Sequence, residues 1–190
     1  YYYSIATVVE LDWMLRPLTF ILESVTGHSF QRDINSEWVS VSANVRLVKA
    51  CAGMNFMLMS FTAYAWVFRT DDRIESDTLS WFVGRILLLF AAIIAAWITC
   101  LLANSLRIIV AMAVNYPGSE VHRLIGMMIY VPLLSLQLAL GDRGNYRAVI
   151  AGPILMYLLL MVVIPILTGN AFQQPALFFE HLLYGSSLIV

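Results

Sequence analysis

The sequence contains little charge. Only 12% of its 190 residues are Asp, Glu, Lys or Arg, whereas 61% are hydrophobic. Soluble domains carry about a quarter charged residues, so this composition excludes a water-soluble globular domain and also a disordered chain. The net charge of −1 comes without a basic stripe, which excludes nucleic acid as a partner. The composition instead predicts an integral membrane protein.

Cysteine is also scarce. Cys51 and Cys100 are too few for a disulfide framework or for a zinc site of several thiolates, and no His-Glu-x-x-His motif occurs. We therefore expect no metal and no cofactor. The chain starts with three tyrosines and stops inside an apolar run, so we interpret it as a fragment of a longer protein in which a signal peptide cannot be judged.

Long apolar runs dominate the chain. A transmembrane helix needs roughly 20 mostly apolar residues, so the chain can hold about five or six spans. We predict an all-α polytopic helical bundle that forms a single integral membrane domain over residues 1–190. The clearest span covers residues 81–102 and continues without a strong breaker to Val114. The other expected spans are residues 1–25, which is weak because charges and Pro17 interrupt it, 52–68, 124–140, 149–167 and 178 onward.

The segment at residues 27–48 has a different pattern. Between positions 39 and 47 apolar residues alternate with polar ones, a period of two that is typical of a half-buried strand. Turn-forming residues, including Asp33, Asn35 and Ser36, precede this run. We predict a short β-hairpin-like segment outside the bilayer, directly before Cys51.

One arginine lies in the middle of an apolar run. Arg107 is flanked by Leu106 and Ile108, and Asn104 precedes it by three residues on the same helical face. A charge inside the bilayer costs a few kcal/mol or more, so such a residue is a candidate for function. The alternative is that Arg107 extends its side chain to the interface while Asn104 packs against another helix.

Cys51 lies where the strand-like segment meets the second expected span. A thiol at a helix N-terminus beside a cation, here Lys49, ionises more readily because the dipole and the charge lower its pKa. The alternative is an inert buried cysteine, which we expect for Cys100 since no cation adjoins it in the sequence. A membrane-impermeant thiol reagent is therefore expected to label Cys51 and not Cys100.

The expected topology brings a histidine to the same membrane face. Two crossings separate Cys51 from Arg107, and none separates Arg107 from His122, so the three residues can converge. A cysteine nucleophile, a cation that stabilises an oxyanion and a histidine that transfers protons together form a proteolytic set. The alternative for His122 is a polar residue at a helix end, and we assign no role to His28 and His181.

Three blocks of the sequence resemble the motifs of one family. They are Ala-Cys-Ala-Gly-Met-Asn-Phe at residues 50–56, Leu-Ala-Asn-Ser-Leu-Arg-Ile at residues 102–108, and His122 followed four residues later by Gly126. In this order they resemble the exosortase/archaeosortase family, which are polytopic membrane cysteine transpeptidases. The first block is most similar to the exosortase K branch. The resemblance runs from about residue 12 to residue 140 and places the catalytic core at residues 51–140.

The resemblance implies a sorting protease of the bacterial inner membrane, with its active site on the extracytoplasmic side. Exosortases act on exported proteins that end in a short motif such as Pro-Glu-Pro, a transmembrane helix and a basic cluster. By position, Cys51 would be the nucleophile that forms a thioacyl-enzyme, His122 the general acid/base and Arg107 the stabiliser of the oxyanion or thiolate. The implied partners are the substrate protein, an acceptor nucleophile and membrane lipids. The implied supporting residues are Asn104, Gly53 and Asn55.

Two positions depart from the family pattern. Family members often have an acidic residue directly after the histidine, whereas this chain has Arg123, which would disfavour the imidazolium. Cys-Ala-Gly also replaces the usual Cys-Ser-Gly. The alternative function is a non-enzymatic membrane protein, such as a small transporter or an assembly scaffold, with Arg107 and Asn104 lining a pathway. Inverted repeats would favour a transporter, and the sequence shows no repeat.

Overall fold

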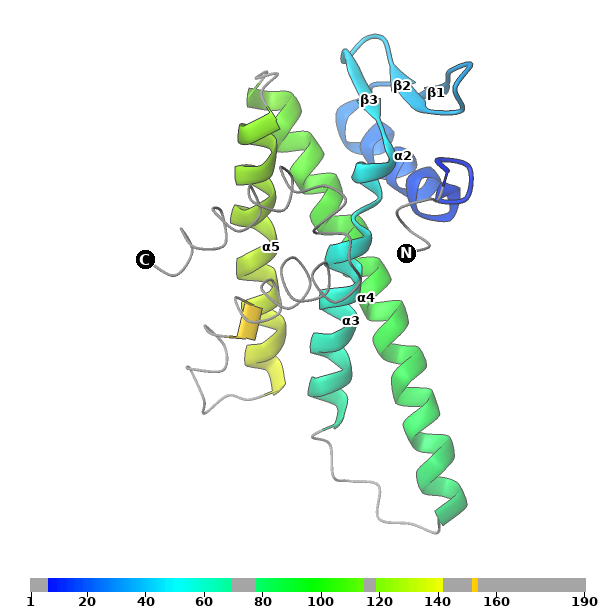
Figure 1. The fold of residues 1–190 in the computed structure, drawn as a ribbon, viewed down its shortest axis with the longest axis vertical. Coiled ribbons are helices and arrows are strands. Elements are labelled where there is room, and N and C mark those ends of the chain that lie inside the picture. Colours follow the sequence, from blue (N-terminus) through cyan, green and yellow to red (C-terminus); the bar gives the residue numbers. More distant parts are fainter. Residues whose placement is uncertain (1–6, 70–77, 115–118, 142–151, 154–190) are drawn as a thin grey trace, which may run out of the picture. The chain divides into compact units, whose positions relative to one another are not determined.

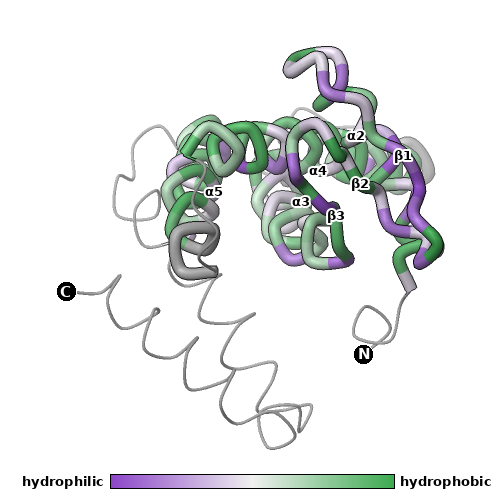
Figure 2. Tube along the Cα trace, turned by 90° about the horizontal axis from the view of Figure 1, so that it is seen from above, coloured by the Kyte–Doolittle hydropathy of each residue, from purple (hydrophilic) through white to green (hydrophobic). Residues whose placement is uncertain are grey.

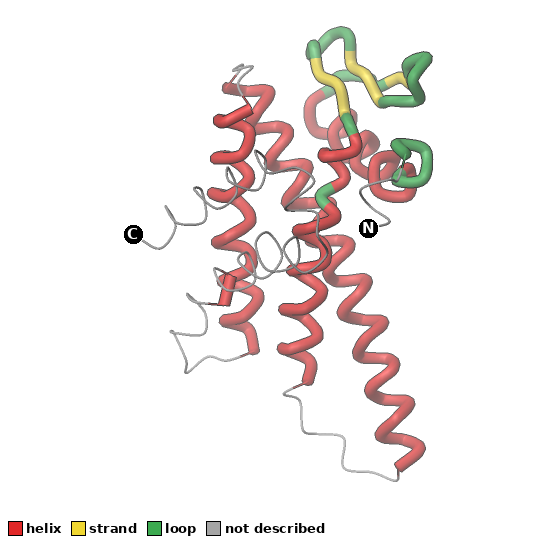
Figure 3. Tube along the Cα trace, in the orientation of Figure 1, coloured by secondary structure: helices red, strands yellow, loops and turns green. Residues whose placement is uncertain are grey.

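A computed structural model describes residues 7–69, 78–114, 119–141 and 152–153 (Figure 1). Most of these residues are helical, and three short strands form a small sheet (Figure 3). The spans expected at residues 149–167 and from 178 onward lie outside the described residues, apart from positions 152 and 153. The elements are α2 (Asp12–Thr26), β1 (Gln31–Arg32), β2 (Trp38–Ser40), β3 (Val45–Leu47), the 3-10 helix η1 (Lys49–Ala52), α3 (Met54–Arg69), α4 (Thr78–Val114) and α5 (Ser119–Gly141).

The chain divides into two compact units. The first contains Tyr1–Leu58 and Ile93–Tyr130, and the second contains Met59–Ala92 and Val131–Val190. The boundaries fall within α3, α4 and α5, so each of these helices contributes residues to both units. The candidate site described below belongs entirely to the first unit.

Two described helices are long and apolar enough to cross a membrane. They cover Lys49–Phe68 and Trp81–Val114, and a shorter apolar helix covers Leu124–Leu140. The prediction of one continuous helix through Arg107 to Val114 is confirmed, because α4 runs over 37 residues. At about 1.5 Å per residue, a helix of this length exceeds the roughly 30 Å of a bilayer's hydrocarbon core. The hydropathy colouring shows α4 and α5 as largely hydrophobic, whereas hydrophobic and hydrophilic residues are mixed in the sheet (Figure 2).

The first expected span forms a shorter helix instead. α2 has 15 residues, fewer than a span requires, and it carries Asp12, Arg16 and Glu23. It ends at Gly27, whose left-handed conformation (φ 72°) lets its N–H donate to the carbonyl of Glu23 at 2.9 Å. α2 is therefore an amphipathic helix with one buried face. That face consists of Leu11, Met14, Leu15, Leu18 and Leu22.

The segment before Cys51 forms a three-stranded antiparallel sheet in the order β1-β2-β3. The expected turn upstream is confirmed, since the N–H of Ser36 donates to the carbonyl of Asp33 at 2.8 Å and Ser36 has a φ of 62°. The expectation of one half-buried strand across positions 39–47 is wrong. The chain reverses between β2 and β3, and Val41 at this turn is 91% exposed. Both arms of a hairpin show a period of two, so the pattern continued across the turn.

Acidic residues of α2 hold the sheet in place. Asp12 accepts a hydrogen bond from Nε1 of Trp38 at 3.0 Å and forms an ion pair with Arg32 at 2.5 Å. The guanidinium of Arg32 lies 5.1 Å from the centre of the Trp38 ring. At the other end of α2, Glu23 accepts from the N–H of Phe30 at 2.7 Å. These contacts place the end of β3, and therefore η1, next to α2.

Candidate functional site

Cys51 lies in η1, between the sheet and α3. Its N–H donates to the carbonyl of Val48 at 2.8 Å. Gly53 then adopts a φ of 66°, a left-handed conformation that glycine reaches without strain and that allows α3 to begin at Met54. The predicted position at the junction with the second span is confirmed. The expected accessibility is wrong, because Cys51 is only 7% exposed and Cys100 is 0% exposed. An impermeant reagent is therefore a poor way to distinguish the two thiols.

Asn104 of α4 binds the backbone of this turn. The residue is buried, and its Nδ2 donates a hydrogen bond to the carbonyl oxygen of Cys51. Its Oδ1 accepts a hydrogen bond from the hydroxyl of Tyr130 at 3.0 Å. An amide with one donor and one acceptor engaged has a defined orientation. Asn104 therefore fixes the backbone of the residue that carries the candidate nucleophile.

Arg107 lies one helical turn after Asn104, and its positive charge acts on the Cys51 thiol. The guanidinium carbon also lies 5.6 Å from the centre of the Tyr130 ring, a cation–π contact. The Nε of Arg107 is buried and has no hydrogen-bond partner among the residues that the structure describes. The Arg107 side chain thus lies against Tyr130, which holds Asn104.

Sequence reasoning did not identify Tyr130 of α5. Its ring stacks on Phe56 of α3, with the centroids 4.2 Å apart and the planes 17° from parallel. Its hydroxyl donates a hydrogen bond to Asn104, and the positive charge of Arg107 also acts on that hydroxyl. Tyr130 follows Gly126 by four residues, so the two lie on one face of α5. This spacing is the signal in the sequence that could have revealed it.

Two glycines allow these helices to approach closely. A Cβ atom on Gly53 would lie 3.0 Å from the Sγ of Cys100 and 3.2 Å from the Nδ2 of Asn104. A Cβ atom on Gly126 would lie 3.4 Å from the Cδ of Arg107. Small residues at such contacts are typical of helices that pack within membranes. A side chain at position 53 would therefore crowd Cys100 and Asn104, and one at position 126 would crowd Arg107.

The remaining candidate residues lie at the edge of what the structure describes. His122 is in the first turn of α5, but its side chain falls outside the described part of the chain. As a residue it shares a face of α5 with Gly126, which faces Arg107. Asn55 lies in the first turn of α3 with an exposed side chain. The roles of His122 and Asn55 stay predictions.

The cluster brings together a sulfur, a cation and a fixed backbone. A guanidinium beside a sulfur favours the thiolate and can also donate to an oxyanion formed next to it. No group of three His, Cys, Asp or Glu residues within the described ranges is arranged to hold a metal ion. No protein-family model, curated protein or solved structure matches the chain.

Proposed function

We propose that this chain is a membrane-embedded cysteine transpeptidase or endopeptidase that cleaves a C-terminal sorting signal on exported proteins. The observation that carries the proposal is the hydrogen bond that the buried Asn104 donates to the carbonyl of Cys51, which fixes α4 against the turn that holds the cysteine. Arg107 supports it, because it lies one turn further along α4 and its charge acts on the Cys51 thiol. Cys51, Asn104 and Arg107 are also the residues of the first two blocks that resemble the exosortase motifs. Sequence pattern and geometry thus select the same residues.

In the proposed reaction, the Cys51 thiol transfers its proton to His122 and the sulfur attacks the scissile carbonyl carbon. Arg107 stabilises the oxygen that becomes negative. The C–N bond then breaks, and His122 gives the proton to the leaving amine, which departs with the transmembrane part of the signal. A thioester to Cys51 remains. His122 next removes a proton from the acceptor, whose attack on the thioester releases the sorted protein and regenerates the thiol.

The proposed setting is a bundle of five or six spans in the bacterial inner membrane, with Cys51 toward the extracytoplasmic side. The two apolar helices that cover Lys49–Phe68 and Trp81–Val114 support a membrane location. The sheet, whose strands carry Gln31, Arg32 and Arg46, directly precedes the Cys51 turn, which suits a site at one membrane face. The same contacts disfavour a pathway-lining role for Asn104 and Arg107, because Cys51 and Tyr130 engage both side chains.

The proposal can be tested by co-expressing the chain with an exported reporter that ends in a Pro-Glu-Pro motif, an apolar helix and an arginine cluster. We expect the reporter to be shortened near the motif and Cys51→Ala to abolish this. A covalent adduct between reporter and chain that hydroxylamine releases would identify the thioester. Cys100→Ala serves as the matched control and should cleave normally. Normal cleavage by Cys51→Ala would contradict the proposal.

A further inference from the structure

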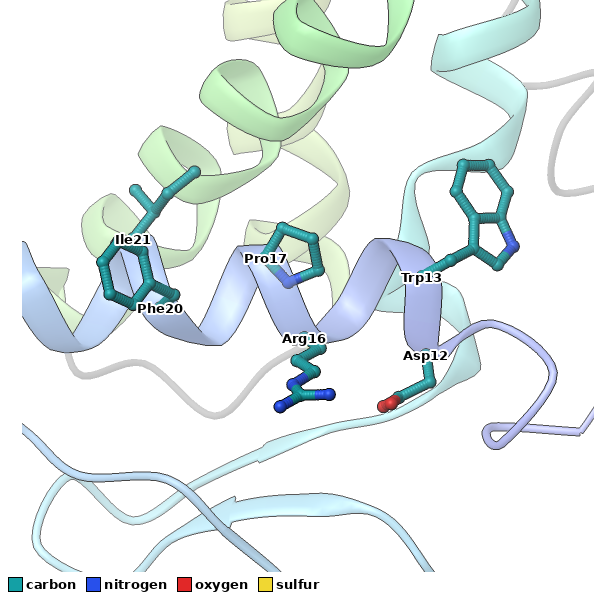
Figure 4. A pocket seen from close by; sticks show the side chains of 6 residues that line it. All are labelled: Asp12, Trp13, Arg16, Pro17, Phe20 and Ile21. Atoms are coloured by element: carbon teal, nitrogen blue, oxygen red, sulfur yellow. The ribbon is translucent and has the colours of Figure 1, made fainter.

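A surface groove follows one side of α2, within the first unit. Its volume is about 640 Å³, and Figure 4 shows the side chains that line it. Two of them are large apolar residues with much of their surface uncovered: Trp13 is 47% exposed and Phe20 is 71% exposed. The lining residues are Asp12, Trp13, Arg16, Pro17, Phe20 and Ile21.

The opposite side of α2 already forms part of the core. Leu15 and Leu22 there are fully buried. A surface helix normally has a single apolar face that packs on the protein, with polar residues on the other side. α2 has apolar residues on both sides, and packing among the residues that the structure describes explains only one of them.

The charged and the apolar side chains lie along different edges of the groove. In Figure 4, Arg16 and Asp12 point toward the strands, whereas Trp13, Pro17 and Ile21 lie along the edge away from the strands. Asp12 is engaged by Arg32 and by Trp38. Arg16 is exposed and forms no ion pair with any of the residues described. The groove therefore offers an apolar wall and one free cation at its rim.

In the proposed membrane setting, α2 lies beside the start of a span, and a lipid-binding role depends on that setting. α2 contacts η1, and η1 is where the apolar helix Lys49–Phe68 begins. The start of a span lies at the boundary between hydrocarbon and headgroups. Tryptophan is enriched at this depth, and amphipathic helices lie in it with arginine directed to the polar side. The arrangement of Trp13 and Arg16 fits this boundary.

We propose that the α2 groove binds one anionic phospholipid, with an acyl chain against Trp13, Pro17 and Phe20 and the headgroup phosphate at Arg16. A single guanidinium complements a single phosphate. A peptide bound in an apolar setting would need hydrogen-bond partners for its own backbone. α2 supplies none, because its backbone N–H and carbonyl groups are bonded within the helix. The lipid site is independent of the proposed proteolytic function, since its residues are separate from Cys51, Asn104 and Arg107.

The test is native mass spectrometry of the full chain in detergent, titrated with dioleoylphosphatidylglycerol. We expect one retained lipid per chain. Arg16→Gln should weaken its apparent affinity by roughly tenfold, the usual effect of losing one charged hydrogen bond. Arg46→Gln, which removes another exposed arginine of the same unit, should leave it unchanged. Phe20→Ser should weaken binding, whereas Ile34→Ser, at a residue 98% exposed in the sheet region, should not.

Two further ligands test the contributions of the acyl chains and of the phosphate separately. Dioleoylglycerol has the same chains without the phosphate and should bind at least about tenfold more weakly. Inorganic phosphate at the same concentration should not displace the lipid, because it lacks the chains. Equal binding of dioleoylglycerol, displacement by phosphate, or equal losses in Arg16→Gln and Arg46→Gln would overturn the proposal. So would displacement by a sorting-signal peptide that binds Arg16→Gln as well as the unchanged chain. Unaltered helical circular dichroism shows that each variant is folded.

Discussion

Cys51 and Cys100 are both buried, yet different groups surround their sulfurs. The Cys100 thiol donates to the carbonyl of Gly53 at 3.3 Å and lies 3.9 Å from the carbonyl oxygen of Ala52. Ionising it would remove this donor and place a negative sulfur against carbonyl oxygens. For the Cys51 sulfur the largest electrostatic influence from another side chain is the charge of Arg107. Burial therefore does not distinguish the two cysteines, whereas the groups around each sulfur do.

We expect the largest difference between the two cysteines when each is replaced in turn by alanine. Cys51→Ala should lower cleavage of a sorting-signal reporter by at least about a thousandfold, as expected for loss of a nucleophile. Cys51→Ser should also be largely inactive, because a hydroxyl is far less ionised than a thiol at neutral pH. Cys100→Ala should retain activity within about twofold. Initial rates in membranes with matched protein levels measure the contrast, and equal losses in both alanine variants would refute it.

Replacing the cation beside Cys51 should have the next largest effect. Arg107→Ala should lower the rate by roughly a hundred- to a thousandfold, and Arg107→Lys should be nearly as damaging. Lysine lacks the planar set of donors that can serve both a sulfur and an oxyanion. Arg85→Lys is the matched control on the same helix, where the guanidinium lies 5.5 Å from the Trp81 ring centre. If Arg107→Lys keeps most of the turnover, Arg107 contributes only its charge.

Tyr130→Phe should have a moderate effect, because it deletes the hydroxyl that orients Asn104 and retains the ring that stacks on Phe56. We expect a loss of about tenfold or less, the size of one hydrogen bond. Alkylation of Cys51 by iodoacetamide should also change its rate and its pH profile, while helix content stays the same. A purely structural tyrosine would leave that profile unmoved. Tyr64→Phe, at a tyrosine that stacks on Phe68 in the second unit, is the control.

We expect the smallest effect at Gly53, and it concerns the free energy of unfolding. Gly53 and Gly27 both have positive φ values, of 66° and 72°. A Cβ atom on Gly27 would meet nothing within 4 Å, whereas one on Gly53 would meet Cys100 and Asn104. Gly27→Ala should therefore lower the free energy of unfolding by about 1 kcal/mol, through backbone strain alone. Gly53→Ala should lower it further, by about 1–3 kcal/mol beyond Gly27→Ala. Unfolding in mixed micelles with increasing SDS measures the difference, and equal losses would show that the close approach is unimportant.

Local pattern in the sequence was enough to predict the helical elements of the site. The apolar run around Arg107 predicted α4 as one continuous helix, and the spacing of Asn104 and Arg107 placed both on one face. The turn before β2 followed from its residue types. By contrast, the period of two across Val41 continued through a turn and concealed the boundary between β2 and β3. The burial of Cys51 also had no local signal.

By itself, the sequence determined that some helices are long and apolar enough to cross a membrane, and it determined how Asn104 and Arg107 are arranged on their helix. Only the tertiary structure decided that Asn104 binds the carbonyl of Cys51 and that Tyr130 orients Asn104. Hydrophobic periodicity reports which face of a single helix is buried, because it depends on neighbours within a few residues. Contacts between helices depend on how closely their backbones approach. At this site, Gly53 and Gly126 permit that approach.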